Sequence, residues 1–252
     1  MPIILASASP RRRELLGVLG VSFLVDVADV DESPHAHEAP EQLVQRLAEA
    51  KALTVSRRRA ASAAGASDAP GVDRTGADAA ARGPIPDVSP SGDDLHPGHD
   101  ELVLAADTTV VLDGAILNKP ADEAEAVAML RALRGRPHRV LTGLAFARAD
   151  TVVWRALAET AVYMRAFTDE EIAAYVASGR PMDKAGAYGI QDREFRPVER
   201  IGGCYTNVVG LPLCEVSLAL ATVGRSRRHD DPSDSARSAS VLCAALCRTS
   251  RR

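Results

Sequence analysis

The positions of hydrophobic and polar residues along the chain predict an α/β fold. Short apolar runs of the kind that form buried strands alternate with stretches that repeat apolar residues at the helical period. The apolar runs predict strands at residues 3–5, 102–112, 115–117, 140–147, 152–164 and 205–209. The helical period predicts helices that begin after Ser9, at Pro40, and after Asp122, Thr168 and Pro212.

Capping residues mark where several of these helices begin. Ser9 and Pro10 supply an N-cap and a first-turn proline. Asp122 is expected to cap the helix that follows it, and Thr168 with Glu171 forms a capping box. These signals agree with the apolar period, so we expect these helices to start at the capped positions.

Residues 102–112 predict the central strand of the fold. They are almost continuously apolar or β-branched, as in strands that are covered on both faces. Asp113 and Gly114 follow and predict a tight turn into the short strand at 115–117.

Two segments are predicted to lie outside the packed core, residues 57–100 because of their composition and the tail after residue 222 because it begins and ends with charged residues. Residues 57–100 consist mostly of Ala, Gly, Pro, Ser and Asp, so burial cannot offset their ordering entropy. We therefore predict one domain at 1–222 with a disordered insertion at 57–100, and a flexible tail at 223–252. The helix at Pro40 is expected to end near residue 55.

Composition narrows the class of protein. The chain has 252 residues, 46% of them hydrophobic, which is enough for a sizeable core. Acidic residues outnumber basic ones by 34 to 30, which argues against a nucleic-acid-binding surface. The chain offers no secretion signal and no apolar run of the roughly 20 residues that span a membrane. We expect a cytoplasmic protein whose four cysteines are reduced.

A cluster of serines and arginines at residues 7–14 predicts an anion site. Arg11, Arg12 and Arg13 occupy the first turn of the expected helix, where they oppose the helix dipole and repel one another. A phosphate group would satisfy them together with Ser7 and the free backbone N–H groups. Alternatively, the arginines simply point into water.

Asp107 is an unusual residue for the strand that contains it. An ionised carboxylate among apolar residues costs several kcal/mol unless a cation or donor meets it. A metal ion or a reacting water is one natural partner, and a structural arginine or a capped loop is the alternative. Oxygen ligands combined with phosphate favour Mg²⁺ or Mn²⁺.

Four further residues are candidates for the same site, each weak by itself. Lys51 lies at the edge of the buried face of its helix, and Lys119 follows the turn after the long strand. Glu32 offers another metal-ligand oxygen, and Gln191 carries an amide of the kind that reads a base edge. Each is also compatible with an ordinary solvent-facing or loop position, and for Lys51 a surface lysine is the commoner explanation.

Covalent nucleophile schemes have little support in the sequence. There is no G-x-S-x-G motif, no Walker-type loop and no zinc-type Cys/His pairing. His138 precedes a strand and is interpreted as structural.

Taken together, these segments resemble the Maf family of nucleoside triphosphate pyrophosphatases. The matching segments, in order, are LASASPRRRELL at 5–16, ADT at 106–108, KP at 119–120, DKAGAYGIQ at 183–191 and VGLPL at 209–213. The resemblance implies a mixed, elongated sheet flanked by helices, with two lobes around a nucleotide-binding cleft. It also implies a divalent metal, frequent homodimers, and hydrolysis of a nucleoside triphosphate to monophosphate and pyrophosphate.

The resemblance also implies roles for individual residues. Asp107 is similar to the catalytic carboxylate, as general base or metal ligand, and Glu32 to an acidic position near the metal. Gln191 is similar to a base-contacting position, and the residues similar to triphosphate-binding positions are Ser7, Arg11, Arg12, Lys51 and Lys119. The arginine after Ser9-Pro10 resembles the subfamily that prefers dTTP and UTP. Modified purine triphosphates, or a weakly catalytic regulator of cell division, are the alternatives.

One segment departs from the family pattern. Many members of the family enter a short strand soon after the position of Gln191. Here residues 191–197, QDREFRP, make this segment several residues longer. This length bears on the base preference. The insertion at 57–100 separates Lys51 from Asp107, but a flexible loop of that length adds only modest closure entropy, so the catalytic assignment should hold.

Overall fold

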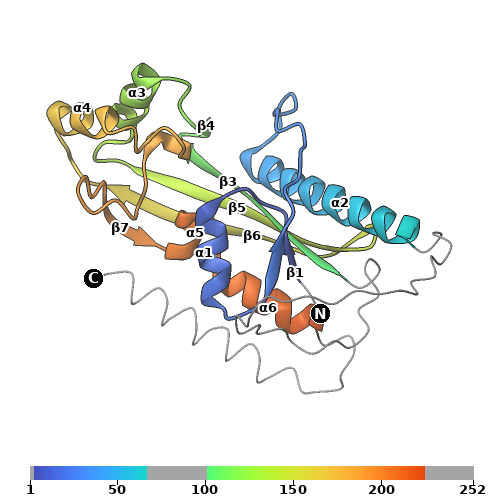
Figure 1. Ribbon diagram of the computed structural model, residues 1–252. Helices are drawn as coiled ribbons and strands as arrows, with labels where there is room; N and C mark the ends of the chain where they lie inside the picture. The colour runs from blue at the N-terminus through green and yellow to red at the C-terminus, as the bar shows by residue number, and fades with distance from the viewer. Residues whose placement is uncertain (1–2, 67–100, 225–252) are drawn as a thin grey trace, which may run out of the picture.

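The computed structural model describes residues 3–66 and 101–224, and these form a mixed α/β structure around a single sheet (Figure 1). The sheet contains seven strands: β1 (Ile3–Leu5), β2 (Phe23–Val25), β3 (Leu102–Leu112), β4 (Ala115–Leu117), β5 (Pro137–Arg148), β6 (Thr151–Met164) and β7 (Val198–Gly202). Their order is β2-β1-β3-β5-β6-β7, and β4 pairs with β3. Strands β1, β2 and β3 run parallel, and the other pairs are antiparallel.

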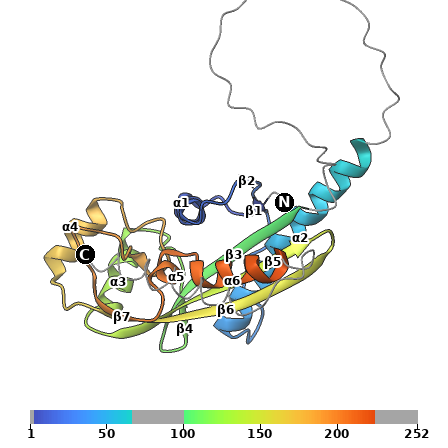
Figure 2. The ribbon, with the colours of Figure 1, turned by 90° about the horizontal axis from the view of Figure 1, so that it is seen from below.

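The helices cover the sheet and its ends. They are α1 (Pro10–Val18), α2 (Pro40–Ala66), α3 (Glu123–Leu133), α4 (Asp169–Ala177), α5 (Tyr205–Val209) and α6 (Leu213–Gly224), with a short 3-10 turn, η1, at Ala185–Ala187. Helices α3 and α4 lie together at one end of the long strands, away from the C-terminal end of α2 (Figures 1 and 2).

Alternate residues of β3 face different helices. Leu102 and Leu104 pack in one apolar cluster with Leu16 of α1 and with α6. Val103 and Ala105 pack in another cluster with α2. The central position expected for this strand is confirmed, because β3 is covered on both faces and pairs with β1, β4 and β5.

A third apolar cluster fills the lobe at the α3–α4 end. It joins Leu130 and Leu133 of α3 to Ile172 and Tyr175 of α4, and it includes Phe195 from the loop before β7. The sheet therefore carries two lobes, one around α1, α2 and α6 and one around α3 and α4. The mixed sheet flanked by helices agrees with the prediction.

Most predicted boundaries are confirmed. Strands β3 and β4 have the predicted limits, and the predicted caps accept the expected backbone N–H groups at Ser9, Asp122 and Thr168. No helix within residues 3–66 and 101–224 is long and apolar enough to cross a membrane.

The strand predicted at residues 205–209 is wrong, because this segment is helix α5. Its Asn207 is fully buried and donates to the carbonyl of Val140, at 3.1 Å, and to the hydroxyl of Thr160, at 3.0 Å. These side-chain bonds to β5 and β6 outweigh the strand preference of the sequence. Strands β2 and β7 were not predicted.

Helix α2 is longer than predicted. It continues past residue 55 to Ala66, so residues 57–66 of the predicted insertion are helical. Arg57, Arg58 and Arg59 form ion pairs there with Asp150, Asp26 and Glu101, respectively. Residues 67–100 and 225–252 lie outside the described part of the chain.

The cysteines differ from the prediction of four reduced thiols. Cys204 carries a reduced thiol, whereas Cys214 is disulfide-bonded. Cys243 and Cys247 lie outside the described residues.

Candidate active site

An opening in one edge of β3 creates the candidate site. Strand β1 pairs with residues 102–104 of β3, and β4 pairs with residues 110–112 on the same edge. Residues 105–109 have no strand partner on that edge within the described chain, while β5 pairs with the other edge throughout. Asp107 lies at the centre of this opening, so its side chain is reachable although the strand is central.

Asp107 faces α2, on the same side of the sheet as Val103 and Ala105. Its Oδ1 lies 2.7 Å from the Nζ of Lys51, and Glu32 Oε1 lies 2.6 Å from the same nitrogen. The side chains of Lys51 and Asp107 are 11% and 15% exposed, whereas that of Glu32 is 62% exposed. Among the residues that the structure describes, the partner of Asp107 is therefore a lysine, and no arginine forms a hydrogen bond with this carboxylate.

A glycine opposite Asp107 lets α2 come close enough for this contact. Gly143 of β5 is the register partner of Asp107. A Cβ at Gly143 would lie 2.2 Å from the carbonyl oxygen of Val44 in α2. Lys51 follows Val44 by two helical turns, so the close approach at Gly143 delivers its ammonium to Asp107.

The surroundings change the proton affinity of Asp107. Burial raises the pKa of its carboxyl above the ordinary 3.8, and the positive charge of Lys51 opposes that rise. The other carboxylate oxygen, Oδ2, has no hydrogen-bond partner within residues 3–66 and 101–224. A buried carboxylate with one oxygen held by a cation and the other open suits a general base.

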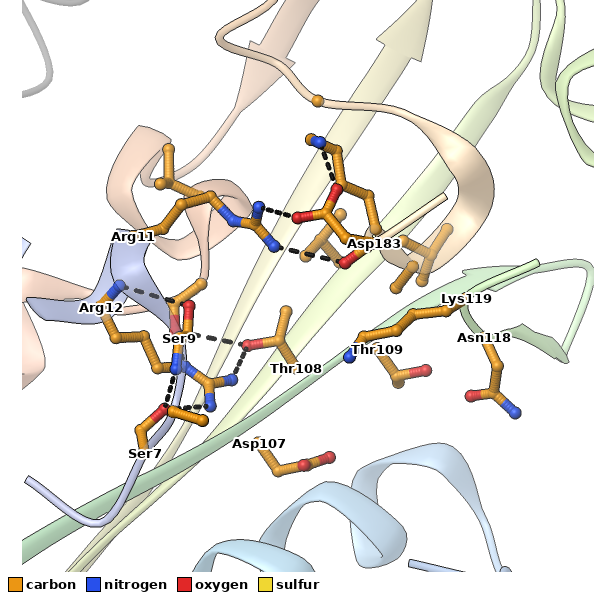
Figure 3. A pocket seen from close by; sticks show the side chains of 18 of the residues that line it. Ser7, Ser9, Arg11, Arg12, Asp107, Thr108, Thr109, Asn118, Lys119 and Asp183 are labelled. Atoms are coloured by element: carbon orange, nitrogen blue, oxygen red, sulfur yellow. Dashed lines mark hydrogen bonds and ion pairs between the residues drawn. The ribbon is translucent and has the colours of Figure 1, made fainter. Parts of the chain in front are cut away.

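The opposite face of β3 holds Arg12. Its guanidinium donates to the carbonyl of Gly210 at 2.8 Å, to the hydroxyl of Thr108 at 3.1 Å and to the hydroxyl of Ser7 at 3.4 Å (Figure 3). Burial lowers the pKa of Arg12, and the negative charge of Asp107 opposes that effect. Three of its five N–H groups are thus used, which orients the group and leaves two donors for a ligand.

Arg11 reaches across the pocket to the 183–191 segment. Its Nη1 lies 2.7 Å from Asp183 Oδ2, and Lys184 Nζ lies 2.5 Å from the other oxygen of the same carboxylate. The carboxylate of Asp183 therefore lies between two cations, in an environment that would also suit an anionic group of a ligand. Arg13 is exposed, so for this arginine the interpretation of a water-facing side chain holds.

One pocket of about 850 Å³ collects these groups. Every candidate from the sequence lines it: Ser7, Arg11, Arg12, Glu32, Lys51, Asp107, Lys119 and Gln191. Lys119 extends into the pocket from the end of β4 (Figure 3). Residues from both lobes contribute, which agrees with a cleft between the lobes.

Several lining groups were not assigned from the sequence. Thr108 and the carbonyl of Gly210 orient Arg12, and Asp183 pairs with Arg11. Arg180 also lines the pocket and pairs with Asp192 at 3.3 Å. The motifs contain Thr108, Gly210 and Asp183, but these contacts join segments that are about 100 residues or more apart, so spacing could not reveal them.

The carboxylates present fit a divalent cation that binds together with a polyphosphate. Glu32 and Asp107 converge on one nitrogen, so two carboxylate oxygens already meet at a single point. No group of three or more His, Cys, Asp or Glu residues suited to a metal occurs in the described chain. Mg²⁺ commonly binds through one or two carboxylates plus substrate phosphates, which is the donor set offered here.

Comparison with known proteins adds to this geometry. A family model described as Maf-like protein matches residues 2–223. The chain belongs to the Maf family. A dTTP/UTP pyrophosphatase from Thermomicrobium roseum is 44% identical over 214 residues, covering 84% of this chain and 80% of the relative. A dTTP/UTP pyrophosphatase from Geobacter metallireducens is 42% identical over 224 residues, covering 88% of this chain and 96% of the relative.

Proposed function

We propose that this Maf-family chain hydrolyses nucleoside triphosphates, with dTTP and UTP preferred, to nucleoside monophosphate and pyrophosphate. The observation that carries the proposal is the opening in β3, where the buried carboxylate of Asp107 pairs with Lys51 and lines the same pocket as Arg11 and Arg12 of α1. The dTTP/UTP pyrophosphatases that are more than 40% identical support the choice of substrate.

Asp107 acts as the general base in this proposal. A water molecule attacks the α-phosphorus, its proton passes to the Asp107 carboxylate, and the bond from that phosphorus to the α–β bridging oxygen breaks. Pyrophosphate leaves with the electrons of that bond. The raised pKa of Asp107 makes it a stronger base than an exposed aspartate, and Lys51 keeps it ionised.

Cations around the opening hold the polyphosphate and stabilise the charge that develops on it. Lys51 and Lys119 supply ammonium groups, Arg12 supplies two oriented N–H groups, and Ser7 supplies a hydroxyl. Arg11 reaches the same anion when it exchanges Asp183 for a phosphate oxygen. A divalent cation, Mg²⁺ or Mn²⁺, would be held by Glu32 and Asp107 and would neutralise phosphate charge as a Lewis acid.

Gln191 contributes to the recognition of the base. It is exposed at the pocket wall, on the segment that follows Tyr188. Its amide can donate to a carbonyl and accept from the N–H of a pyrimidine ring. In this proposal the enzyme acts in the cytoplasm, removes nucleotides from the pool, and forms a homodimer, which light scattering of the full chain would test.

Release of pyrophosphate from a panel of triphosphates tests the proposal. With Mg²⁺ we expect the fastest release from dTTP and UTP, and slower release from standard and modified purine triphosphates. Asp107→Asn should lower kcat about 100- to 10,000-fold while the protein stays folded.

Asp113→Asn is a matched control, because Asp113 is exposed, lies in the turn after β3 and pairs with Arg136 outside the pocket. An unchanged rate in Asp107→Asn would remove Asp107 from the mechanism. If no triphosphate yields pyrophosphate with any divalent cation, the assignment as an enzyme is wrong.

A further inference from the structure

His138 and Tyr188 form a buried hydrogen-bonded pair at the pocket wall, which Tyr188 lines. His138 lies in β5 and is 4% exposed, and Tyr188 is 5% exposed. The imidazole Nε2 lies 2.7 Å from the phenol oxygen, and the rings meet edge to face with centroids 5.4 Å apart. Within the described chain, neither side chain has another hydrogen-bond partner, and the second imidazole nitrogen, Nδ1, is buried without one.

The direction of this hydrogen bond follows from counting donors. Burial lowers the pKa of His138 to about 4, so its ring is neutral at pH 7 and carries a single N–H. If Nε2 carried that proton, both the Tyr188 hydroxyl proton and the Nδ1 lone pair would lack a partner. If Tyr188 donates to Nε2, the Nδ1–H alone lacks a partner, so this arrangement costs less.

Tyr188 begins the part of the pocket wall that carries Gln191. The backbone N–H of Gly189 donates to the hydroxyl of Tyr175 at 3.2 Å, and a Cβ at Gly189 would lie 2.9 Å from the stem of Lys184. The Gln191 side chain makes no hydrogen bond within the described residues. Its place in the pocket therefore depends on how the backbone of 188–191 is held.

Two apolar side chains would fill the space of this pair without leaving a buried N–H group unpaired, which is unfavourable. The pair lies where it can anchor the wall opposite the phosphate-binding cations. We infer that His138 is a positioning residue which, through its hydrogen bond to Tyr188, fixes the wall that presents Gln191 to the nucleobase. This inference rests on the proposed function, because it assumes that a nucleotide base binds at that wall.

The inference predicts a selective loss of base recognition. Tyr188→Phe and His138→Leu should each raise KM for UTP about 5- to 30-fold, with kcat changed less than about 3-fold, because the contact orders the wall that binds the base and does not touch the reacting phosphate. The inhibition constant of inorganic pyrophosphate, which has no base, should change less than about 2-fold. The double variant should be no worse than either single one.

Two further variants separate positioning from simple stabilisation. His138→Gln can still accept from the Tyr188 hydroxyl and should keep KM near the wild-type value. Tyr163→Phe removes a tyrosine hydroxyl outside the pocket and should change neither constant. An unchanged KM in Tyr188→Phe, or an equal loss of pyrophosphate binding, would overturn the inference even if melting temperatures fall.

The proposed function can fail separately from this inference. If the wild type binds UTP in calorimetry but releases no pyrophosphate, the enzyme proposal fails. The role of His138 can then still be decided by measuring the dissociation constants of UTP and of pyrophosphate for the same variants. If the wild type neither binds nor hydrolyses any nucleotide, both are wrong.

Discussion

Gly143 of β5 lies directly opposite Asp107 of β3, and the side chain that Gly143 lacks leaves the space that helix α2 occupies. The backbone of Val44 fills that space, and Lys51, two turns later, contacts the carboxylate at 2.7 Å. One glycine in a buried strand thus sets the distance between the two charged groups of the site.

Adding a methyl group at Gly143 should disturb both the fold and the activity. Gly143→Ala places its Cβ against backbone, which cannot rotate away, so we expect a loss of about 1–3 kcal/mol in the free energy of unfolding. Displacement of Lys51 should lower pyrophosphate release at least about 10-fold. Urea denaturation and initial rates measure these effects.

Gly17→Ala is the matched control for that substitution. Gly17 lies in α1 with open space around it, so this change should stabilise the protein by roughly 0.5–1 kcal/mol and leave the rate unchanged. A Gly143→Ala variant as stable and active as the wild type would show that α2 is not held by this contact.

The acid limb of the pH profile should report Asp107. The ionised carboxylate is the base, so kcat/KM should fall as the pH drops through a pKa that lies above 3.8. Lys51 lowers that pKa, so Lys51→Met should shift the acid limb to higher pH as well as reduce the rate. Lys119→Met should weaken substrate binding without moving the acid limb of the pH profile, because Lys119 is not among the charges that shift the pKa of Asp107. A limb that stays in place in Lys51→Met would contradict this assignment.

Acid should destabilise the protein in part through His138. The unfolded chain binds a proton on this residue near pH 6.5, and the folded protein does so only near pH 4. The stability from His138 is therefore complete above pH 6.5 and is lost as the pH falls to about 4, by roughly 3 kcal/mol. In His138→Gln the free energy of unfolding should depend less on pH in this window, measured by urea denaturation at pH 7.5 and 4.5. Equal pH dependence in both proteins would show that His138 is not buried as a neutral ring.

Removing the divalent cation should abolish hydrolysis without unfolding the chain. Glu32 and Asp107 are already bound to Lys51, and the described chain has no third carboxylate to complete a site. Mg²⁺ alone should therefore shift the melting temperature by less than about 1 °C, and Mg²⁺ with a non-hydrolysable UTP analogue should shift it further. A large shift from Mg²⁺ alone would indicate a preformed metal site.

The local parts of the fold were predictable because their causes are local. The caps at Ser9 and Asp122, the capping box at Thr168 and the turn after Leu112 each depend on residues within about four positions. Short edge strands were missed because they exist by pairing. Strand β7, which reads VERIG, has little apolar pattern of its own and is defined by its register with β6.

By itself, the sequence determined which residues could carry charge into an apolar environment, and it placed Asp107, Lys51 and the arginines of residues 11–12 among them. Only the tertiary structure decided how these groups meet. The opening in β3 exists because β1 and β4 both end before they reach residues 105–109 on the same edge, and the contact between Lys51 and Asp107 exists because α2 packs against Gly143. Both depend on pairing and packing between segments that are far apart along the chain, which neither composition nor spacing encodes.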